Sequence, residues 1–389
     1  MRVFLIAGEA SGDKLGGALM AGLRQLRPDV DFAGVGGALM QAQGLDSLFD
    51  MSELSVMGIS EVLPRYPHLR RRMHETSRAA LRFRPDVLIT IDSPDFCLRV
   101  ASKVRASSKI RTVHYVAPSV WAWRAGRAAR MARHIDQVLA LLPFEPPYME
   151  AAGMRCDFVG HPIVAEPRVP DAQLHRFRAD HGLGTSPVVL ALPGSRRGEI
   201  SRLGPVFGQA LERVAARHPD SRVVVPAAPA VVDQVRAAAR HWPGNPVVLD
   251  PTGLPADLAE TRKRAAFAAA DVAIAASGTV SLELCAARTP MVVAYDMKWL
   301  SWQIMSRLAR IDTVTLVNLV TGRRTIPEFL GPDCRADPIS EAVCDLLGNE
   351  MARDEQFAAM RETMELLGAG GEAPGLRAAR AVLDGLENT

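Results

Sequence analysis

The chain has 389 residues, of which 48% are hydrophobic and 23% charged, so it is long enough for two domains and too apolar to be disordered. Its net charge of +3 is too small to indicate a nucleic-acid partner. The five cysteines are scattered and form no Cys-x-x-Cys pair, which argues against a disulfide framework or a zinc site and favours the reducing cytoplasm.

The first predicted elements are a strand from Val3 to Ala7, a loop from Gly8 to Asp13 and a helix that runs to about Arg27. The strand is too short for a signal peptide, and no later apolar run approaches the roughly 18 residues of a membrane span. The loop lacks the Gly-x-Gly-x-x-Gly pattern of dinucleotide-binding proteins, which weighs against a dehydrogenase. Its candidate cleft residues are Glu9, Ser11, Gly12 and Asp13.

The stretch from Met51 to Arg84 combines apolar residues at helical spacing with many basic ones, namely seven arginines against one carboxylate between residues 65 and 84. Because Pro64 and Pro67 interrupt the pattern, we predict a short helix, a break and a second helix opened by Pro67. Two interpretations stay open: a helix that packs on the core with a basic, solvated back, or a surface that lies on an anionic membrane. The membrane interpretation assigns that surface to Ile59, Val62, Leu63, Tyr66, Leu69, Arg70, Arg71 and Arg72.

A buried strand is predicted from Pro85 to Asp92, and Ser93-Pro94-Asp95 ends it. Asp92 therefore stands at the carboxyl end of a parallel strand, where open α/β sheets bind their ligands. A carboxylate at this position could take a proton from an incoming hydroxyl as a general base, or it could be structural. Asp95 is better placed to cap the next helix.

The next strand, Arg111 to Ala117, leads into Trp121 and Trp123. A second basic surface is expected on the helix that follows, at Arg124, Arg127, Arg130 and Arg133. Two histidines beside strands, His114 and His161, are expected to be structural. Two more strands complete the first half, at Gln137 to Leu142 and Arg155 to Val159.

The second half begins with a polar linker and an entry helix between Glu166 and Asp180. Its first strand, Val188 to Leu192, stops at Pro193-Gly194, and Ser195 is predicted to cap the following helix. Free N–H groups at that helix start would attract an anion, Gly194 would allow its close approach, and Arg196 offers a planar fork for phosphate. A diphosphate site and an ordinary strand-to-helix turn with a surface arginine are both compatible with this segment.

A second turn of this kind is predicted after further strands at Arg222 to Pro226 and Pro246 to Leu249. It comprises a strand from Asp271 to Ala276, the turn Ser277-Gly278-Thr279, and a helix to Arg288 that carries Glu283. Glu283 could accept both hydroxyls of a ribose. Two more loops are expected at the same rim, one from Asp296 to Lys298 after a strand from Met291 to Tyr295, and one at Asn318 after a strand from Thr313 to Val317.

The alternation of strands and helices in both halves predicts an α/β protein with two Rossmann-like, doubly wound domains that face each other across a cleft. The first domain would span residues 1–165 and the second residues 166–371. Gly368-Ala369-Gly370-Gly371 separates the last two helices, so the final helix, at about 372–389, could pack back on the first domain.

Five motifs, in order along nearly the whole chain, together resemble the lipid-A-disaccharide synthases: Gly8 to Asp13, Ile91 to Asp95, Val116 to Arg124, Leu192 to Arg196, and Ser277 to Thr279 with Glu283. The resemblance implies a GT-B glycosyltransferase that joins UDP-2,3-diacylglucosamine to 2,3-diacylglucosamine 1-phosphate through a β-1,6 bond and releases UDP. It also implies an inverting enzyme without metal or other cofactor, bound peripherally to the inner membrane of a Gram-negative cell. It further suggests a homodimer with exchanged C-terminal elements.

Carried over residue by residue, the resemblance makes Asp92 the base for the acceptor hydroxyl and Arg196 the diphosphate-binding arginine. Glu9 and Asn318 match positions important to activity whose roles stay unassigned. The donor side would comprise Gly194, Ser195, Arg196, Ser277, Gly278, Thr279, Glu283, Met297 and Asn318. The family's membrane stretch can be more apolar than this one, which contains Ser60, Pro64, Pro67 and Arg70, so attachment would be weaker or depend more on arginine.

Two classes of alternative function stay open. Among enzymes, they are a UDP-sugar epimerase and a GT-B glycosyltransferase that acts on a different lipid. The other class is a membrane sensor that binds a UDP-sugar without turnover. An epimerase needs no apolar acceptor surface, and a sensor would form no product.

Overall fold

The computed structural model describes residues 1–54, 59–122, 126–276, 278, 280–297, 302–303 and 311–387, with only the backbone for 59–65. The chain divides into two compact units. Unit 1 comprises Met1–Ala165 with Leu367–Thr389, and unit 2 comprises Glu166–Leu366. The chain thus passes from one unit to the other twice, and it returns to unit 1 at Leu367, a few residues before the predicted boundary at 371.

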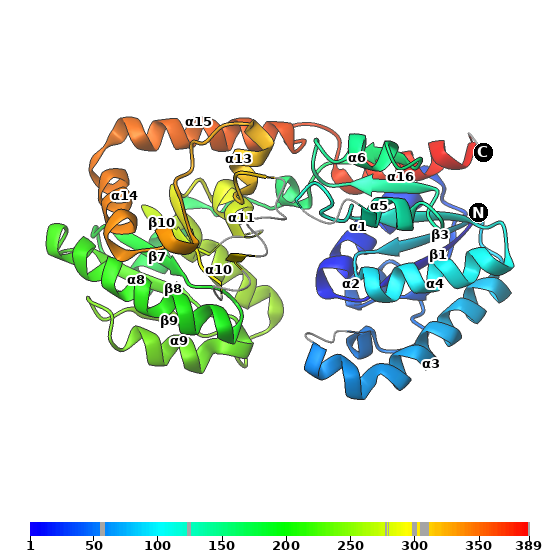
Figure 1. Cartoon of the computed structure of the whole chain (residues 1–389), viewed down its shortest axis with the longest axis horizontal. Coiled ribbons are helices and arrows are strands. Elements are labelled where there is room, and N and C mark those ends of the chain that lie inside the picture. Colours follow the sequence, from blue (N-terminus) through cyan, green and yellow to red (C-terminus); the bar gives the residue numbers. More distant parts are fainter. Residues whose placement is uncertain are drawn as a thin grey trace. The chain divides into compact units, whose positions relative to one another are not determined.

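Unit 1 contains a parallel six-stranded sheet in the order β2-β1-β3-β4-β5-β6 (Figure 1). Its strands are β1 Arg2–Ala7, β2 Asp31–Val35, β3 Val87–Ile91, β4 Arg111–Tyr115, β5 Gln137–Ala140 and β6 Arg155–Phe158. All five residues of β3 are buried, as expected for a parallel strand with both faces covered. The short β2 was not predicted.

Helices cover both faces of the unit 1 sheet. They are α1 Ala10–Leu26, α2 Ala38–Ala42, α3 Ile59–Phe83, α4 Pro94–Ser107, α5 Gly126–Met131, α6 Pro146–Glu150 and α16 Pro374–Glu387, with 3-10 turns at Met51–Leu54 and Pro162–Ala165. One apolar core lies between the sheet and α1, α2 and α16, and the other lies between the opposite face and α3, α4, α5 and α6. Both faces of the sheet are therefore shielded from water.

The C-terminal helix α16 packs on α1 of the same chain. The two helices approach closely because glycines lie at the contact: a Cβ added to Gly22 would be 2.7 Å from the carbonyl oxygen of Gly375. Side chains from the sheet side also hold α16, since Gln137 Nε2 donates to the carbonyl of Ala381 at 2.8 Å and Arg377 donates to the carbonyl of Phe158 at 3.0 Å. The last helix is thus an integral part of unit 1.

Helix α3 is continuous from Ile59 to Phe83, so the predicted break at Pro67 is wrong. Its second half is fixed by tertiary contacts, because Met73, Ala79 and Ala80 are buried in the core of unit 1. Packing of this kind outweighs the local penalty of a proline, which removes one backbone donor. None of the helices in the described ranges is long and apolar enough to cross a membrane.

Unit 2 contains a second parallel six-stranded sheet, in the order β12-β11-β10-β7-β8-β9 (Figure 1). Its strands are β7 Val188–Leu192, β8 Arg222–Pro226, β9 Val247–Leu249, β10 Val272–Ala275, β11 Met291–Tyr295 and β12 Glu328–Leu330. Its helices are α7 Asp171–Asp180, α8 Arg197–Arg217, α9 Val232–Ala239, α10 Ala256–Ala269, α11 Val280–Ala287, α13 Leu316–Thr321, α14 Ala336–Gly348 and α15 Glu350–Leu366, with 3-10 turns at Pro229–Val231 and Gly331–Asp333.

The predicted strand from Thr313 to Val317 is wrong, because this segment leads into α13 and the edge strand is β12 instead. A side chain of β12 explains the difference. Glu328 Oε1 accepts hydrogen bonds from the Thr313 hydroxyl at 2.7 Å and from the N–H groups of Val314 and Thr315 at 3.0 and 2.6 Å. A single half-buried carboxylate thus satisfies donors that would otherwise bond to a neighbouring strand.

Each sheet has a switch point, where the connections leave neighbouring strands in opposite directions. It lies between β1 and β3 in unit 1 and between β7 and β10 in unit 2. In open α/β sheets, ligands bind beyond the carboxyl ends of the strands at such points. Among the predicted site residues, Glu9, Asp92, Gly194 and Gly278 lie in the loops that follow these four strands.

Candidate active site

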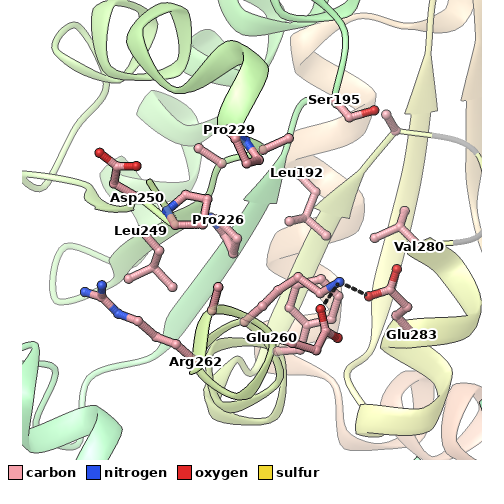
Figure 2. A pocket seen from close by; sticks show the side chains of 18 of the residues that line it. Leu192, Ser195, Pro226, Pro229, Leu249, Asp250, Glu260, Arg262, Val280 and Glu283 are labelled. Atoms are coloured by element: carbon pink, nitrogen blue, oxygen red, sulfur yellow. Dashed lines mark ion pairs between the residues drawn. The ribbon is translucent and has the colours of Figure 1, made fainter. Parts of the chain in front are cut away.

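A cavity of about 930 Å³ lies at the carboxyl edge of the unit 2 sheet (Figure 2). Five strands contribute to its lining at or just beyond their ends, through Leu192, Pro226, Leu249, Ala276 and Tyr295. Helix α10 closes another side with Ala256, Ala259, Glu260, Arg262, Lys263 and Phe267. The size and mixed lining are those of a small-molecule site.

The loop after β7 borders this cavity through Gly194, Ser195 and Arg196. Gly194 has a φ of +113°, a conformation that only glycine adopts readily. The N-cap of α8 is Arg196 rather than the predicted Ser195. The Arg196 side chain is 75% exposed and can therefore reach a ligand at the rim.

The backbone donors predicted to be free at the start of α8 already have a partner. Glu199 Oε2 accepts hydrogen bonds from the N–H groups of Ser195 at 3.0 Å and Arg196 at 3.2 Å. This carboxylate closes the helix start in the manner of a capping box. The prediction of open N–H groups after β7 is therefore wrong for these two residues.

The turn after β10 reaches the same cavity through Gly278, Val280 and Glu283, while Ser277 and Thr279 lie outside the described residues. Glu283 Oε2 lies 2.6 Å from Lys263 Nζ, which also lies 3.2 Å from Glu260 Oε2 (dashed lines in Figure 2). Burial opposes the charge of Lys263, but the carboxylates of Glu283 and Glu260 together outweigh it and keep the pKa of Lys263 above its usual value. Lys263 was not predicted from the sequence, because it lies among several other charged residues of α10 and no local motif distinguishes it.

The opposite part of the lining is more apolar. Figure 2 shows Pro226, Pro229 and Leu249 together on the side away from Glu283. Asp250 borders this part, and its carboxylate is held by Arg236 Nη2 at 2.6 Å and by the N–H of Thr252 at 2.8 Å. A flat, weakly polar group would fit beside the prolines, and a hydroxylated group beside Glu283.

Two other predicted donor residues do not line the cavity. Met297 is half-buried after β11 and precedes residues outside the described ranges. Asn318 is completely buried: its Nδ2 donates to the carbonyl of Ile326 at 2.9 Å, and its Oδ1 accepts the N–H of the same residue at 2.9 Å. Asn318 fixes the segment that leads to β12, and its assignment to the donor side stays a prediction.

In unit 1, Asp92 lies immediately after β3 with φ at +49°, and Ser93 follows at +41°. Left-handed backbone at successive non-glycine residues is strained and is often found at functional sites. The Ser11 hydroxyl is 3.5 Å from Asp92 Oδ2, and β1 pairs with β3 so that Ala7 lies opposite Ile91. The structure therefore brings together the two loops predicted to line a cleft.

Glu9 belongs to this cluster. Burial, and then the negative charge of Asp92, raise the pKa of Glu9 above its ordinary value. Gly8 is needed for the close approach, since a Cβ there would be 2.6 Å from Ser93 Oγ. Two carboxyl groups at one edge of a sheet, one of them with a raised pKa, are a common arrangement for proton transfer.

Asp13 and Gly12 have structural roles instead. The Asp13 carboxylate is buried and accepts the N–H groups of Gly37, Leu39 and Met40 at 2.8 to 3.0 Å, which fixes the start of α2. Gly12 is buried against β3. Their assignment to a cleft stays a prediction. A second cavity of about 590 Å³ borders the cluster at Ala10, and the described residues that line it include Asp46 and Asp50 but no lysine or arginine.

The residues of the predicted membrane surface on α3 differ in their exposure. The side chains of Ile59, Val62 and Leu63 lie outside the described residues. Tyr66, Arg70 and Arg71 are exposed. Leu69, by contrast, packs against the core, and Arg72 binds Glu53 at 2.6 Å and Glu75 at 2.7 Å, so the structure already gives both side chains partners within unit 1. Their assignment to a membrane surface stays a prediction.

The loop after β4 is anchored by a residue that sequence reasoning missed. Trp121 Nε1 donates to Glu145 Oε1 at 3.3 Å, and Glu145 Oε2 accepts the N–H groups of Leu141 at 3.1 Å and Leu142 at 3.0 Å. Burial raises the pKa of Glu145 to about 7. Trp123 and Arg124 lie outside the described residues, and His114 is buried with its Nδ1 2.8 Å from the Thr90 hydroxyl.

Comparisons with known proteins now decide the family. A family model described as lipid-A-disaccharide synthetase matches residues 3–373. The chain belongs to this family. A lipid-A-disaccharide synthase of Ruegeria pomeroyi is 63% identical over 386 residues, covering 99% of this chain and 96% of the relative. One of Rhodospirillum centenum is 47% identical, covering 98% and 94%. The predicted enzyme class, a glycosyltransferase of lipid A biosynthesis, is confirmed.

The structural comparisons confirm the GT-B fold class. UDP-GlcNAc 2-epimerase from Neisseria meningitidis bound to UDP-GlcNAc has a TM-score of 0.64 at 13% identity, with complete coverage of both chains. An MnaA–UDP structure from S. aureus has a TM-score of 0.65 at 14% identity, covering 98% and 94%. At these identities the likeness establishes the fold alone, and the synthetase family match distinguishes this chain from the epimerases.

Proposed function

We propose that this member of the lipid-A-disaccharide synthetase family transfers a diacylglucosamine from UDP-2,3-diacylglucosamine to the 6-hydroxyl of 2,3-diacylglucosamine 1-phosphate. The products are a β-1,6-linked disaccharide and UDP. The observation that carries the proposal is a nucleotide-sized cavity at the switch point of unit 2, in a chain that matches the family over residues 3–373.

The UDP part of the donor is assigned to the unit 2 cavity. The uracil ring would lie beside Pro226, Pro229 and Leu249, and the ribose hydroxyls would donate to Glu283. The diphosphate would lie at the start of α8 beside Arg196. Two structures with the same fold support this assignment, since one is bound to UDP-GlcNAc and the other to UDP.

Departure of UDP leaves negative charge on the diphosphate, which must be stabilised as the sugar bond breaks. The exposed guanidinium of Arg196 and the positive end of α8 supply fixed charge where it develops. Arg262 adds a further cation to the cavity lining. Stabilising the leaving group is therefore assigned to unit 2.

Activation of the acceptor hydroxyl is assigned to Asp92. Asp92 stands at the carboxyl end of β3 in strained backbone, and burial, followed by the Asp92 charge, raises the pKa of the neighbouring Glu9. Asp92 would take the proton of the 6-hydroxyl as that oxygen attacks the anomeric carbon. Attack from the side opposite UDP inverts the anomeric configuration.

We also propose that exposed residues of α3 hold the enzyme peripherally on the cytoplasmic face of the inner membrane, where acylated substrates reside. Tyr66, Arg70 and Arg71 are exposed on this helix. Arginines meet lipid phosphates, and an aromatic ring favours the interface. Flotation with vesicles that contain anionic lipid tests this at low and high salt. Absence of binding at low salt would contradict it.

The reaction itself is tested by offering the purified protein both sugar lipids and measuring UDP and disaccharide. We expect both products in equal amounts, and neither lipid alone should yield disaccharide. An altered UDP-sugar without any need for acceptor would favour an epimerase. Binding of UDP with no product from any combination would favour a sensor.

A further inference from the structure

The carboxylate of Glu199 occupies the anion-binding position at the start of α8. Its Oε2 accepts the N–H groups of Ser195 and Arg196 at 3.0 and 3.2 Å, and its Oε1 lies 3.7 Å from Arg196 Nη1. These two backbone donors and this guanidinium are the groups expected to recognise a diphosphate. The chain thus places an anion of its own where the ligand's anion is expected.

The loop is shaped around this carboxylate. The Glu199 side chain is only 13% exposed, and a Cβ on Gly194 would collide with it. The φ of +113° at Gly194 brings the turn into contact with the carboxylate. The contact is therefore part of the packing of the loop and differs from the loose ion pairs of a surface helix.

The charges around the cavity make a second anion unfavourable while Glu199 stays in place. The lining contains the cations Arg196, Arg262 and Lys263 and the carboxylates Glu199, Asp250, Glu260 and Glu283. Asp250 and Glu283 already have cationic partners, Arg236 and Lys263. Glu199 is the carboxylate that shares its donors with the diphosphate position, so moving it both frees the donors and removes a like charge.

We propose that Glu199 is a positioning residue that competes with the donor's diphosphate, which must displace it from the N–H groups of Ser195 and Arg196. This rests on the assignment of UDP to the unit 2 cavity. When the glycosyl bond has broken, return of the carboxylate to the loop helps to expel UDP. Glu199 thereby keeps the loop folded between turnovers and sets the affinity for UDP below the value that the donors alone would give.

Calorimetry with UDP and with uridine tests the proposal, because uridine lacks the diphosphate. In Glu199→Gln the competitor becomes a neutral, weaker acceptor, and we expect UDP to bind roughly three- to tenfold more tightly while uridine is unaffected. Glu199→Asp keeps the charge but is one methylene shorter, and it should also tighten UDP binding. Glu260→Gln removes one charge from the same lining without touching the loop, so its effect on UDP should be smaller.

The outcomes separate the proposals. Unchanged or weaker UDP binding in both folded Glu199 variants, as judged by thermal melting, overturns the competition. An equal change in the affinity for uridine also overturns the competition, because a general structural effect of the substitution would then explain the tighter binding of both ligands. If UDP does not bind the unaltered protein at all, the assignment of the donor site fails instead. Amide NMR signals of Ser195 and Arg196 should shift with UDP and remain in place with uridine.

Discussion

The switch points of the two units differ in the chemistry that follows the same strand arrangement. In unit 2, glycines and short polar turns border a cavity of about 930 Å³ with charges of both signs. In unit 1, the equivalent edge carries strained backbone at Asp92 and Ser93 and a second carboxyl group at Glu9. A roomy, mixed lining suits recognition, while a crowded pair of carboxyl groups suits proton transfer.

The two units share a fold, so a few side chains determine which unit suits ligand recognition and which suits proton transfer. Both sheets are parallel, have six strands and place their loops at the carboxyl edge. Neither the order of strands nor the composition of the core distinguishes a binding edge from a reactive one. We therefore expect substitutions in unit 1 to alter turnover with little effect on UDP affinity, and substitutions in unit 2 to alter UDP affinity.

The largest effect is expected for Asp92→Asn. Loss of the general base should lower turnover by about a thousandfold, because base catalysis of this kind contributes on the order of 10² to 10⁴ in rate. UDP affinity, measured by calorimetry, should stay within about twofold. Asp95→Asn is the matched control, since Asp95 is exposed in the first turn of α4. Wild-type turnover in Asp92→Asn would reject the role of base.

The next largest effect concerns the stability of unit 1. Burial raises the pKa of Glu145 to about 7, so between its unfolded value near 4.5 and about 7 the folded chain binds this proton more strongly than the unfolded chain. The contribution of Glu145 should therefore fall as pH rises through this window, by up to about 3 kcal/mol. Urea unfolding at pH 5 and pH 8 measures it, and Glu145→Gln should show a flatter dependence. Identical slopes in both proteins would contradict the assignment.

Arg196→Ala should act on the binding side of the comparison. Removing a charge-assisted contact to the diphosphate should weaken UDP binding by about 2 kcal/mol, or roughly thirtyfold, as measured by calorimetry. The neighbouring Arg197 is exposed but does not line the cavity, so Arg197→Ala serves as the control and should lose much less. Equal losses in the two variants would show that net charge, rather than a specific contact, attracts UDP.

Much of the fold could be predicted because buried parallel strands are continuous apolar runs. The strands Val188–Leu192 and Met291–Tyr295 have the predicted bounds. The failures occurred where distant side chains outweigh local propensity. Hydrogen bonds to Glu328 hold Thr313 and Thr315 outside a strand. Tertiary packing keeps α3 helical across Pro67.

The site could be predicted in part for a related reason. Strand ends identify which residues reach an edge, so Asp92 and Arg196 could be located from their position alone. Position does not show whether a polar side chain is already satisfied. Asp13 and Asn318 bind backbone groups within their own units, and Glu199 holds the N–H groups expected to be free. These contacts depend on tertiary structure and leave no local signal.

The smallest expected effect tests whether the paired charges of unit 2 orient the ribose. Lys263→Met would leave Glu283 without the cation that holds it at 2.6 Å. The carboxylate should then adopt more orientations, and affinity should fall by roughly three- to tenfold for UDP and uridine alike, because both carry the ribose. Glu260→Gln is the control, since it removes the more distant partner of Lys263 and leaves the pair with Glu283 intact. A loss confined to UDP would show instead that Lys263 acts on the diphosphate, which would extend the phosphate-binding part of the cavity from the start of α8 to α10.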